Sequence, residues 1–115
     1  MSELTFKYLQ SINWSRAEAW HKGVEWTLSD WMTALTGEIG EAANVIKKLN
    51  RIRDGMTGNK PHETADSLCA DLAKELADCQ MYLDLLATAA GVDLGQATID
   101  KFNETSERLG RPERL

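Results

Sequence analysis

The sequence predicts an all-α fold, a bundle of four to five helices that is completed by oligomerisation. Three observations lead to this fold class. Apolar residues recur every three or four positions in four segments. The connectors between these segments are short and polar, and two of the segments are long for a chain of 115 residues. We therefore expect a single helical domain over residues 1–115, whose longest helices need a second subunit to cover them.

The first two helices are expected at residues 2–22 and from about Ser29 to Arg53. Residues 13–15 are a candidate interruption of the first helix, and residues 23–28 form a connector. Ser29 is a good N-cap, and Asp30 suits the positive end of a helix. The first helix has apolar positions at Leu4, Tyr8, Ile12 and Trp20. The second has an apolar stripe of Trp31, Leu35, Ala42, Val45, Ile46, Leu49 and Ile52.

The third and fourth helices are expected at residues 63–90 and 93–109, after a loop at 54–62. Gly91 is a typical residue for the end of the third helix. Its expected core face consists of Leu68, Leu72, Leu76, Cys79, Leu83 and Leu86. A second, mostly acidic stripe lies beside that face and consists of Asp71, Glu75, Asp78 and Tyr82. The fourth helix has apolar positions at Leu94, Ala97, Ile99 and Phe102.

Composition excludes several classes of function. The net charge of -5 argues against nucleic acid as a partner, because there is no basic excess to displace counterions. No apolar run is long enough to cross a bilayer, and no early segment has the pattern of a signal peptide. Cys69 and Cys79 are ten positions apart in one expected helix, too far to form a disulfide. A reducing, cytoplasmic location is therefore expected.

Two pairs of acids form the candidate functional site. Glu38 and Glu41 are three residues apart on the second expected helix, and Glu75 and Asp78 repeat this spacing on the third. Three residues are close to one helical turn, so each pair shares a helix face. If the two helices pack side by side, four carboxylates point into one space. Mg²⁺ prefers oxygen ligands of this kind, and Mn²⁺ can substitute for it.

The surroundings of these acids favour a metal site over solvated surface charge. Glu38 lies within the apolar stripe, where an unpaired acid costs several kcal/mol. No Lys or Arg stands three or four residues from Glu38 or Glu41, although Lys74 could pair with Asp78. A di-iron site is disfavoured, because such sites use two Glu-x-x-His pairs. His62 has no acid three residues before it, so Glu18 and His21 offer one such pair at most.

Longer sequence words around the acids resemble a known family. Residues 37–44 read GEIGEAAN and residues 75–78 read ELAD. Tyr82 follows the second word by one turn, and residues 101–103 read KFN. Together these motifs are similar to the signature of the all-α nucleoside triphosphate pyrophosphohydrolases, the MazG-like superfamily. The resemblance covers about residues 26–109 and is to the short, single-domain members.

The resemblance implies Mg²⁺-dependent hydrolysis of a nucleoside triphosphate between its α and β phosphates. By this match the metal ligands are Glu38, Glu41, Glu75 and Asp78. Glu38 or Glu41 would also take the proton from the attacking water. Lys101 would bind a phosphate, and Tyr82 and Asn103 are candidates for sugar or phosphate contacts. The family also implies a homodimer or tetramer.

Several alternatives stay open at this stage. A related branch of the family cleaves phosphoribosyl-ATP, and a non-catalytic helical interaction module with a degenerate metal site is a different class of function. Lys48, two turns after Glu41, could reach a phosphate, although a solvated helix end explains it equally well. Candidate walls of a base pocket are Trp14, Trp20 and Trp26.

Overall fold

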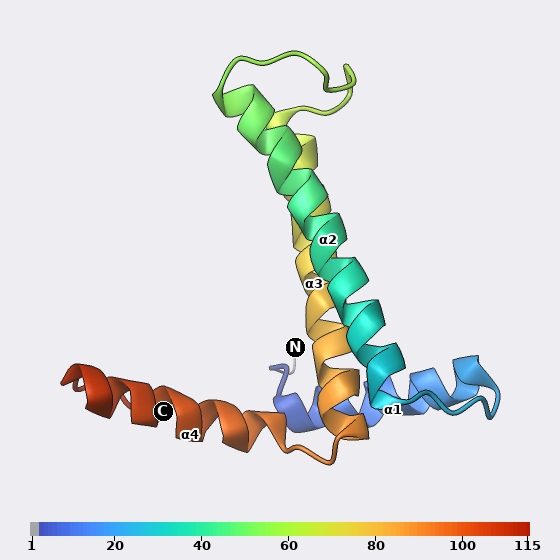
Figure 1. Cartoon of the computed structure of the whole chain (residues 1–115), viewed down its shortest axis with the longest axis vertical. Coiled ribbons are helices and arrows are strands. Elements are labelled where there is room, and N and C mark those ends of the chain that lie inside the picture. Colours follow the sequence, from blue (N-terminus) through green and yellow to red (C-terminus); the bar gives the residue numbers. More distant parts are fainter. Residues whose placement is uncertain (1–2) are drawn as a thin grey trace. The chain divides into compact units, whose positions relative to one another are not determined.

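The computed structural model describes residues 3–115, which form four helices (Figure 1). Their bounds are α1 Phe6–His21, α2 Leu28–Arg53, α3 Ala65–Ala89 and α4 Leu94–Leu109. No strand occurs within residues 3–115, so the predicted all-α class is confirmed. The helices of this part of the chain lack the combination of length and apolarity needed to span a membrane.

The chain divides into two compact units, and each is described by itself below. Ser29–Leu83 forms the first unit, which contains nearly all of α2 and most of α3. The segment up to Leu28 and the segment Asp84–Leu115 form the second, which contains α1 and α4. A single domain over residues 1–115 stays a prediction.

Capping side chains set the helix ends, and they correct the predicted bounds by a few residues. The Thr5 side chain accepts a hydrogen bond from the Tyr8 backbone N–H, so α1 begins at Phe6. The predicted start at Ser2 lies outside the described residues. Thr64 and Ser67 each accept the other's backbone N–H, which starts α3 at Ala65 instead of Glu63.

Asp93 caps α4 in the same way, and Gly110 ends it. The Asp93 carboxylate accepts the Gln96 N–H at 3.0 Å, so α4 begins one residue later than predicted, at Leu94. Gly110 has a φ of 67°, in the left-handed region that glycine adopts without strain. The last helix therefore ends at Leu109, as predicted.

The suspected interruption at residues 13–15 does not occur, because α1 is continuous there. Asn13 is only 4% exposed and donates from Nδ2 to the Asp84 carboxylate at 2.9 Å. Asp84, at 3% exposed, lies near the end of α3. This buried polar contact joins α1 to the last turns of α3 within the second unit.

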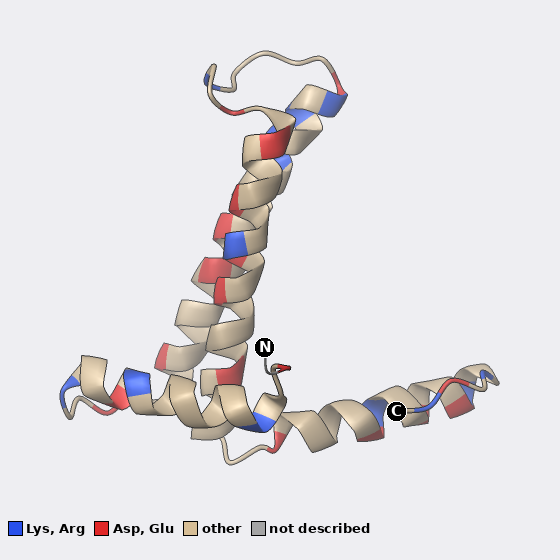
Figure 2. Cartoon of the chain, turned by 180° about the vertical axis from the view of Figure 1, so that it is seen from behind, with Lys and Arg blue, Asp and Glu red and all other residues tan. Residues whose placement is uncertain are grey.

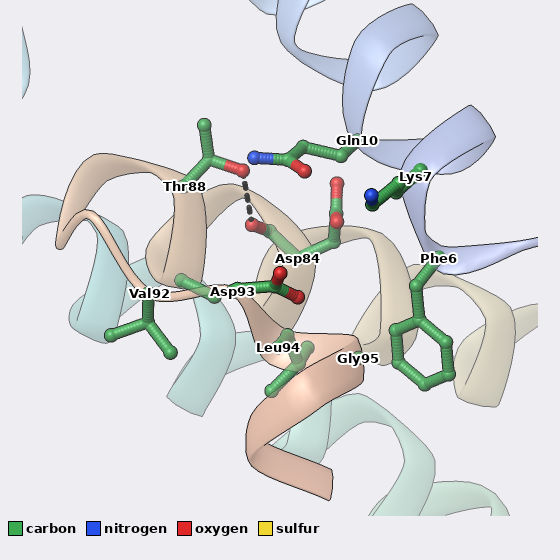
Figure 3. A pocket seen from close by; sticks show the side chains of 10 residues that line it. Phe6, Lys7, Gln10, Asp84, Thr88, Val92, Asp93, Leu94 and Gly95 are labelled. Carbon is green, nitrogen blue, oxygen red and sulfur yellow. Dashed lines mark hydrogen bonds between the residues drawn. The ribbon is translucent and has the colours of Figure 1, made fainter. Parts of the chain in front are cut away.

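A cavity of about 10 Å³ lies next to that contact, which is room for a single water. Figure 3 shows Gln10 and Lys7 of α1 facing Asp84 and Thr88 of α3 across it. Gly95 at the start of α4 lies so close to α1 that an added Cβ would be 3.3 Å from the Cβ of Phe6. A side chain at this position would push α1 and α4 apart.

The first unit is a hairpin in which α2 and α3 run antiparallel, side by side (Figure 1). Its buried apolar residues are Trp31, Leu35, Ala42 and Leu68. The loop at 54–64 is fixed to α2 by Asn59, which donates to the Lys48 carbonyl at 2.9 Å and accepts from Arg51. Glu63 adds an ion pair with Lys48.

Part of the predicted core is wrong. Leu76 is 54% exposed, and Leu83, Ile46 and Ile52 are also exposed. The apolar band of each helix is wider than the single neighbouring helix can cover, so one edge of it faces outward. In α3 the half-buried Glu75, Asp78 and Tyr82 turn inward instead of Leu76 and Leu83. Asp71, the first residue of the acidic stripe, is exposed.

The tryptophans are not one core cluster. Trp31 is buried and Trp14 and Trp26 are half-buried, but Trp20 is 71% exposed. The other apolar positions predicted for the first helix, Leu4, Tyr8 and Ile12, are also exposed. Cys69 and Cys79 are both free, as expected from their spacing.

Candidate metal centre

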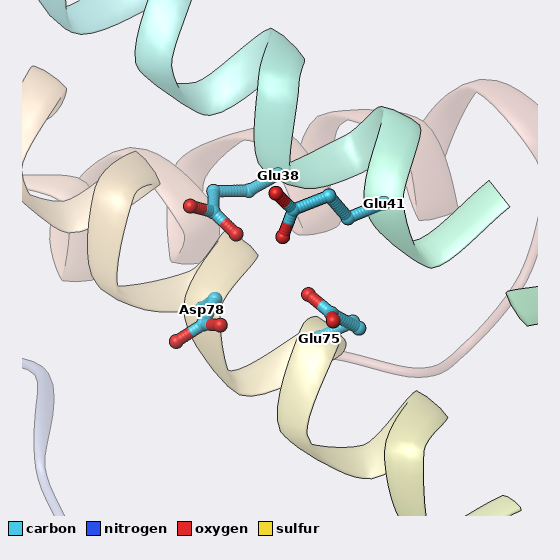
Figure 4. A group of neighbouring side chains, drawn as sticks. All are labelled: Glu38, Glu41, Glu75 and Asp78. Atoms are coloured by element: carbon cyan, nitrogen blue, oxygen red, sulfur yellow. The ribbon is translucent and has the colours of Figure 1, made fainter. Parts of the chain in front are cut away.

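The four predicted acids come together between α2 and α3. Glu38 and Glu41 project from α2, and Glu75 and Asp78 project from α3 toward them (Figure 4). One carboxylate oxygen of each residue lies within 4.8 Å of one oxygen of every other. The arrangement follows from the two three-residue spacings and the antiparallel pairing of the helices.

The acids are partly removed from water. Glu38, Glu75 and Asp78 are half-buried, whereas Glu41 is exposed. The Oε2 atoms of Glu38 and Glu75 are buried and have no hydrogen-bond partner among the described residues. Unpartnered buried oxygens are costly, so these two oxygens fit a site that binds a cation.

The electrostatics of the cluster also fit a cation. Burial is the main cause that raises the pKa of Glu38, and the neighbouring Glu41, Asp78 and Glu75 raise it further. Burial likewise raises the pKa of Glu75, with Glu41 as the next cause. Close like charges in a partly dry space favour proton or metal uptake. A set of four carboxylates suits a hard divalent ion, and the residues present therefore fit Mg²⁺.

The expected pairing of Lys74 with Asp78 is wrong. The ion pairs within residues 3–115 include neither Lys74 nor any of the four acids. Figure 2 shows acidic residues recurring along the α2–α3 hairpin. The negative charge of the cluster is therefore not neutralised by an ion pair in the described chain.

A groove of about 310 Å³ opens from the acid cluster, and the sequence did not predict that its residues form one groove. It is lined by Asn44, Val45 and Lys48 of α2, by Asp71 and Lys74 of α3, and by Glu41 and Glu75. We call it the lysine groove. The only sequence signal for this groove is helix spacing, because residues one turn from Glu41 and Glu75 share the helix face of those acids.

Tyr82 lies on the other side of the acids along α3. It is half-buried, and its ring centre lies 6.4 Å from that of Trp31. Both residues belong to the hairpin unit. Trp31 was predicted as core, and its packing against Tyr82 places an aromatic pair about one turn from Asp78.

The other predicted substrate residues lie on α4 in the second unit. Lys101 pairs with Glu104 at 3.1 Å. Asn103 donates to the Leu115 carbonyl and accepts the Leu115 N–H, so its amide is occupied by the last residue. A role for Lys101 or Asn103 in substrate binding stays a prediction.

The candidate base-pocket residues lie in the second unit as well. Trp14 donates from Nε1 to Glu18 at 2.9 Å. His21 lies between Trp20 and Trp26, with ring centres 5.9 Å and 4.5 Å away. Neither His21 nor His62 belongs to the acid cluster.

Two known proteins are similar to this chain over 77 residues, or 67% of its length. Mouse dCTP pyrophosphatase 1 is 35% identical, and the match covers 42% of that protein. The Gene 37 protein of Mycobacterium phage L5 is 34% identical, and the match covers 61% of it. No family model matches the chain. The chain thus has recognisable similarity to a nucleotide pyrophosphatase, over about half the length of these relatives.

Proposed function

We propose that this protein is a Mg²⁺-dependent nucleoside triphosphate pyrophosphohydrolase. It cleaves the bond between the α and β phosphates and releases a nucleoside monophosphate and pyrophosphate. The observation that carries the proposal is the acid cluster, in which four carboxylates from two helices converge and two buried oxygens have no partner. The similarity to a protein named dCTP pyrophosphatase 1 supports the same reaction.

The four acids have distinct tasks in this reaction. Glu38, Glu41, Glu75 and Asp78 hold the cation, and the half-buried position of all but Glu41 limits competition from water. Bound Mg²⁺ supplies charge neutralisation on the phosphates and a lower pKa for a coordinated water. Glu38 or Glu41 accepts the proton of the attacking water. Burial and the neighbouring acids raise the pKa of Glu38, which makes its carboxylate a stronger base than an ordinary glutamate.

Nucleotide binding uses groups around the cluster. Tyr82 is half-buried next to Asp78, where its ring can pack against the nucleoside, and the buried Trp31 supports it from behind. Lys48 lines the lysine groove, where a phosphate can reach it in competition with Glu63. Lys101 and Asn103 contribute further contacts in this proposal. The substrates to test first are deoxycytidine triphosphate and the other pyrimidine nucleoside triphosphates.

A homodimer at least, and at most a tetramer, is the proposed assembly. Exposed apolar residues recur at intervals of seven on both hairpin helices, at Met32, Ile39 and Ile46 and at Leu76 and Leu83. Ile39 and Leu76 each follow an acid of the cluster by one residue, roughly 100° around the helix. Because α2 and α3 are antiparallel, these steps turn both sets to the same side of the hairpin, away from Glu41 and Asp78. A second copy can bury this apolar face.

The location proposed is the cytoplasm, where nucleotides and free thiols such as Cys69 and Cys79 occur. The function is tested by pyrophosphate release from the common ribo- and deoxyribonucleoside triphosphates and from phosphoribosyl-ATP, with Mg²⁺ and with chelator. Turnover of a nucleoside triphosphate that stops in chelator is the expected result. If none of these nucleotides is cleaved, the protein is a non-catalytic interaction module. If only phosphoribosyl-ATP is cleaved, the protein is a phosphoribosyl-ATP pyrophosphohydrolase.

A further inference from the structure

The lysine groove has a defined place beside the acid cluster. On α2 it extends from Glu41 through Asn44 to Lys48, and on the antiparallel α3 it extends from Glu75 back to Asp71. Both directions lead toward the loop at 54–64. The Trp31–Tyr82 pair lies beyond the cluster in the opposite direction. The acids are thus flanked by a groove with two lysines at one end and by two aromatic rings at the other.

We propose that the lysine groove binds the terminal phosphates of the substrate, with Lys48 and Lys74 as the phosphate ligands. This inference rests on the proposed function and gives the substrate a direction along the hairpin. The nucleoside lies at the Tyr82 end, the bond to be cleaved lies at the acids, and the leaving pyrophosphate lies between the two lysines.

The charges of the groove fit a phosphate only together with a cation. Lys48 and Lys74 are accompanied by Glu41, Asp71 and Glu75. Without a metal, three acids outweigh two lysines and repel an anion. Bound Mg²⁺ reduces the negative charge at Glu41 and Glu75, so less acidic charge opposes the two lysines. Pyrophosphate should therefore bind to the groove when Mg²⁺ is present and fail to bind in chelator.

The two lysines differ in what holds them. Lys48 Nζ forms an ion pair with Glu63 Oε2 at 2.5 Å, and the Glu63 side chain is only 9% exposed. The other Glu63 oxygen accepts the Lys60 N–H at 2.7 Å within the loop. Lys74 is exposed and forms no ion pair within residues 3–115. An entering phosphate must compete with Glu63 for Lys48, whereas Lys74 is available at once.

Because phosphate and Glu63 compete for Lys48, measurements of pyrophosphate affinity can distinguish a phosphate ligand from an ion pair that only fixes the loop. The affinity of the Mg²⁺-loaded protein for inorganic pyrophosphate is measured by titration calorimetry. Lys48→Met and Lys74→Met should each weaken binding about tenfold, the loss of one charged hydrogen bond. Glu63→Gln should strengthen binding, because it releases Lys48. Lys47→Met is the matched control, since Lys47 is an exposed α2 lysine outside the groove.

Opposite effects of Lys48→Met and Glu63→Gln identify Lys48 as a phosphate ligand. If the pair only fixes the loop, both variants change affinity in the same direction. Lys48→Arg keeps the charge and should restore binding, and melting in chelator shows that each variant is folded. Unchanged pyrophosphate affinity in both lysine variants, with nucleotide turnover intact, overturns the groove but leaves the proposed function. A wild-type protein that neither binds pyrophosphate nor cleaves nucleotides overturns both.

Discussion

Glu38 opposes folding and supports function through the same carboxylate. It projects from an otherwise apolar stripe of α2, and one of its oxygens is buried without a partner. Burial and three neighbouring acids raise its pKa, so its charge is disfavoured in the metal-free protein. A divalent cation reverses the balance, because the same oxygen then becomes a ligand.

Glu38→Gln should abolish turnover and leave the protein folded. Glutamine keeps the shape of the side chain but removes the charge that holds metal, so turnover should fall below about a tenth of wild type, a loss of at least ~1.4 kcal/mol. In chelator the melting temperature should hold or rise, because an unpaired buried charge is removed. Glu107→Gln, an exposed change on α4, controls for net charge. Retained turnover would remove Glu38 from the site.

Stability without metal should depend on pH through the same residue. The folded-state pKa of Glu38 is raised above that of the unfolded chain, so the folded protein binds the proton more tightly. This contribution is favourable at low pH and is lost as pH rises from about 4.3, the ordinary glutamate pKa, through the raised value. Urea unfolding in chelator should therefore show Glu38→Gln gaining stability over wild type as pH rises. A constant difference from pH 4 to 8 would contradict the raised pKa.

At the scale of elements, the site depends on the pairing of α2 with α3. Each helix supplies two acids, and neither pair alone makes a four-oxygen site. Metal binding therefore joins the helices directly. At the end of the hairpin where the loop connects the two helices, Asn59 and Glu63 hold the loop against Lys48 of α2.

Mg²⁺ or Mn²⁺ should raise the melting temperature. A ligand that binds only the folded hairpin stabilises it by mass action, by about 2.7 kcal/mol at a concentration 100 times its Kd. Melting is compared in chelator and in several millimolar Mg²⁺, with and without a non-hydrolysable nucleotide. Glu38→Gln should lose most of the shift. Superimposable curves under all these conditions would speak against a metal site between the helices.

The helices and the site were accessible from sequence because their signals are local. Thr, Asp and Gly caps fix helix ends to within a few residues, as Asp93 and Gly110 illustrate. The predicted cap Ser29 is wrong, because α2 already begins at Leu28. The acid cluster was predictable because its spacing repeats on two neighbouring helices. The convergence of all four acids needed only the side-by-side packing that the structure shows.

Sequence periodicity could not tell which edge of a wide apolar band is covered. Leu76 and Leu83 were expected inside, but the acidic stripe occupies the inner side and leaves them exposed. The groove was missed because Lys74 was assigned to Asp78 by helix spacing alone. Gly37 and Gly40 lie inside a helix, where glycine is unfavourable. The described chain gives no packing reason for either, since an added Cβ at each position meets no atom within 4 Å.

At the scale of the whole molecule, the exposed apolar face of the hairpin predicts a homodimer at least. Ile39→Asp places a charge in the middle of that face and should convert the assembly to monomers. Lys47→Asp introduces the same side chain on α2 outside the apolar set and should leave the mass unchanged. Light scattering at micromolar concentration measures both. A monomer mass for an active wild-type sample would refute the dimer.

In the proposed reaction, the four acids direct water to one bond of a nucleoside triphosphate. Phosphorus NMR of the products formed by wild type and Glu38→Gln in Mg²⁺ is the decisive measurement, because it identifies the bond that breaks. We expect nucleoside monophosphate and pyrophosphate in equal amounts from wild type and neither product from Glu38→Gln. Nucleoside diphosphate with inorganic phosphate, or identical products from the two proteins, would contradict it.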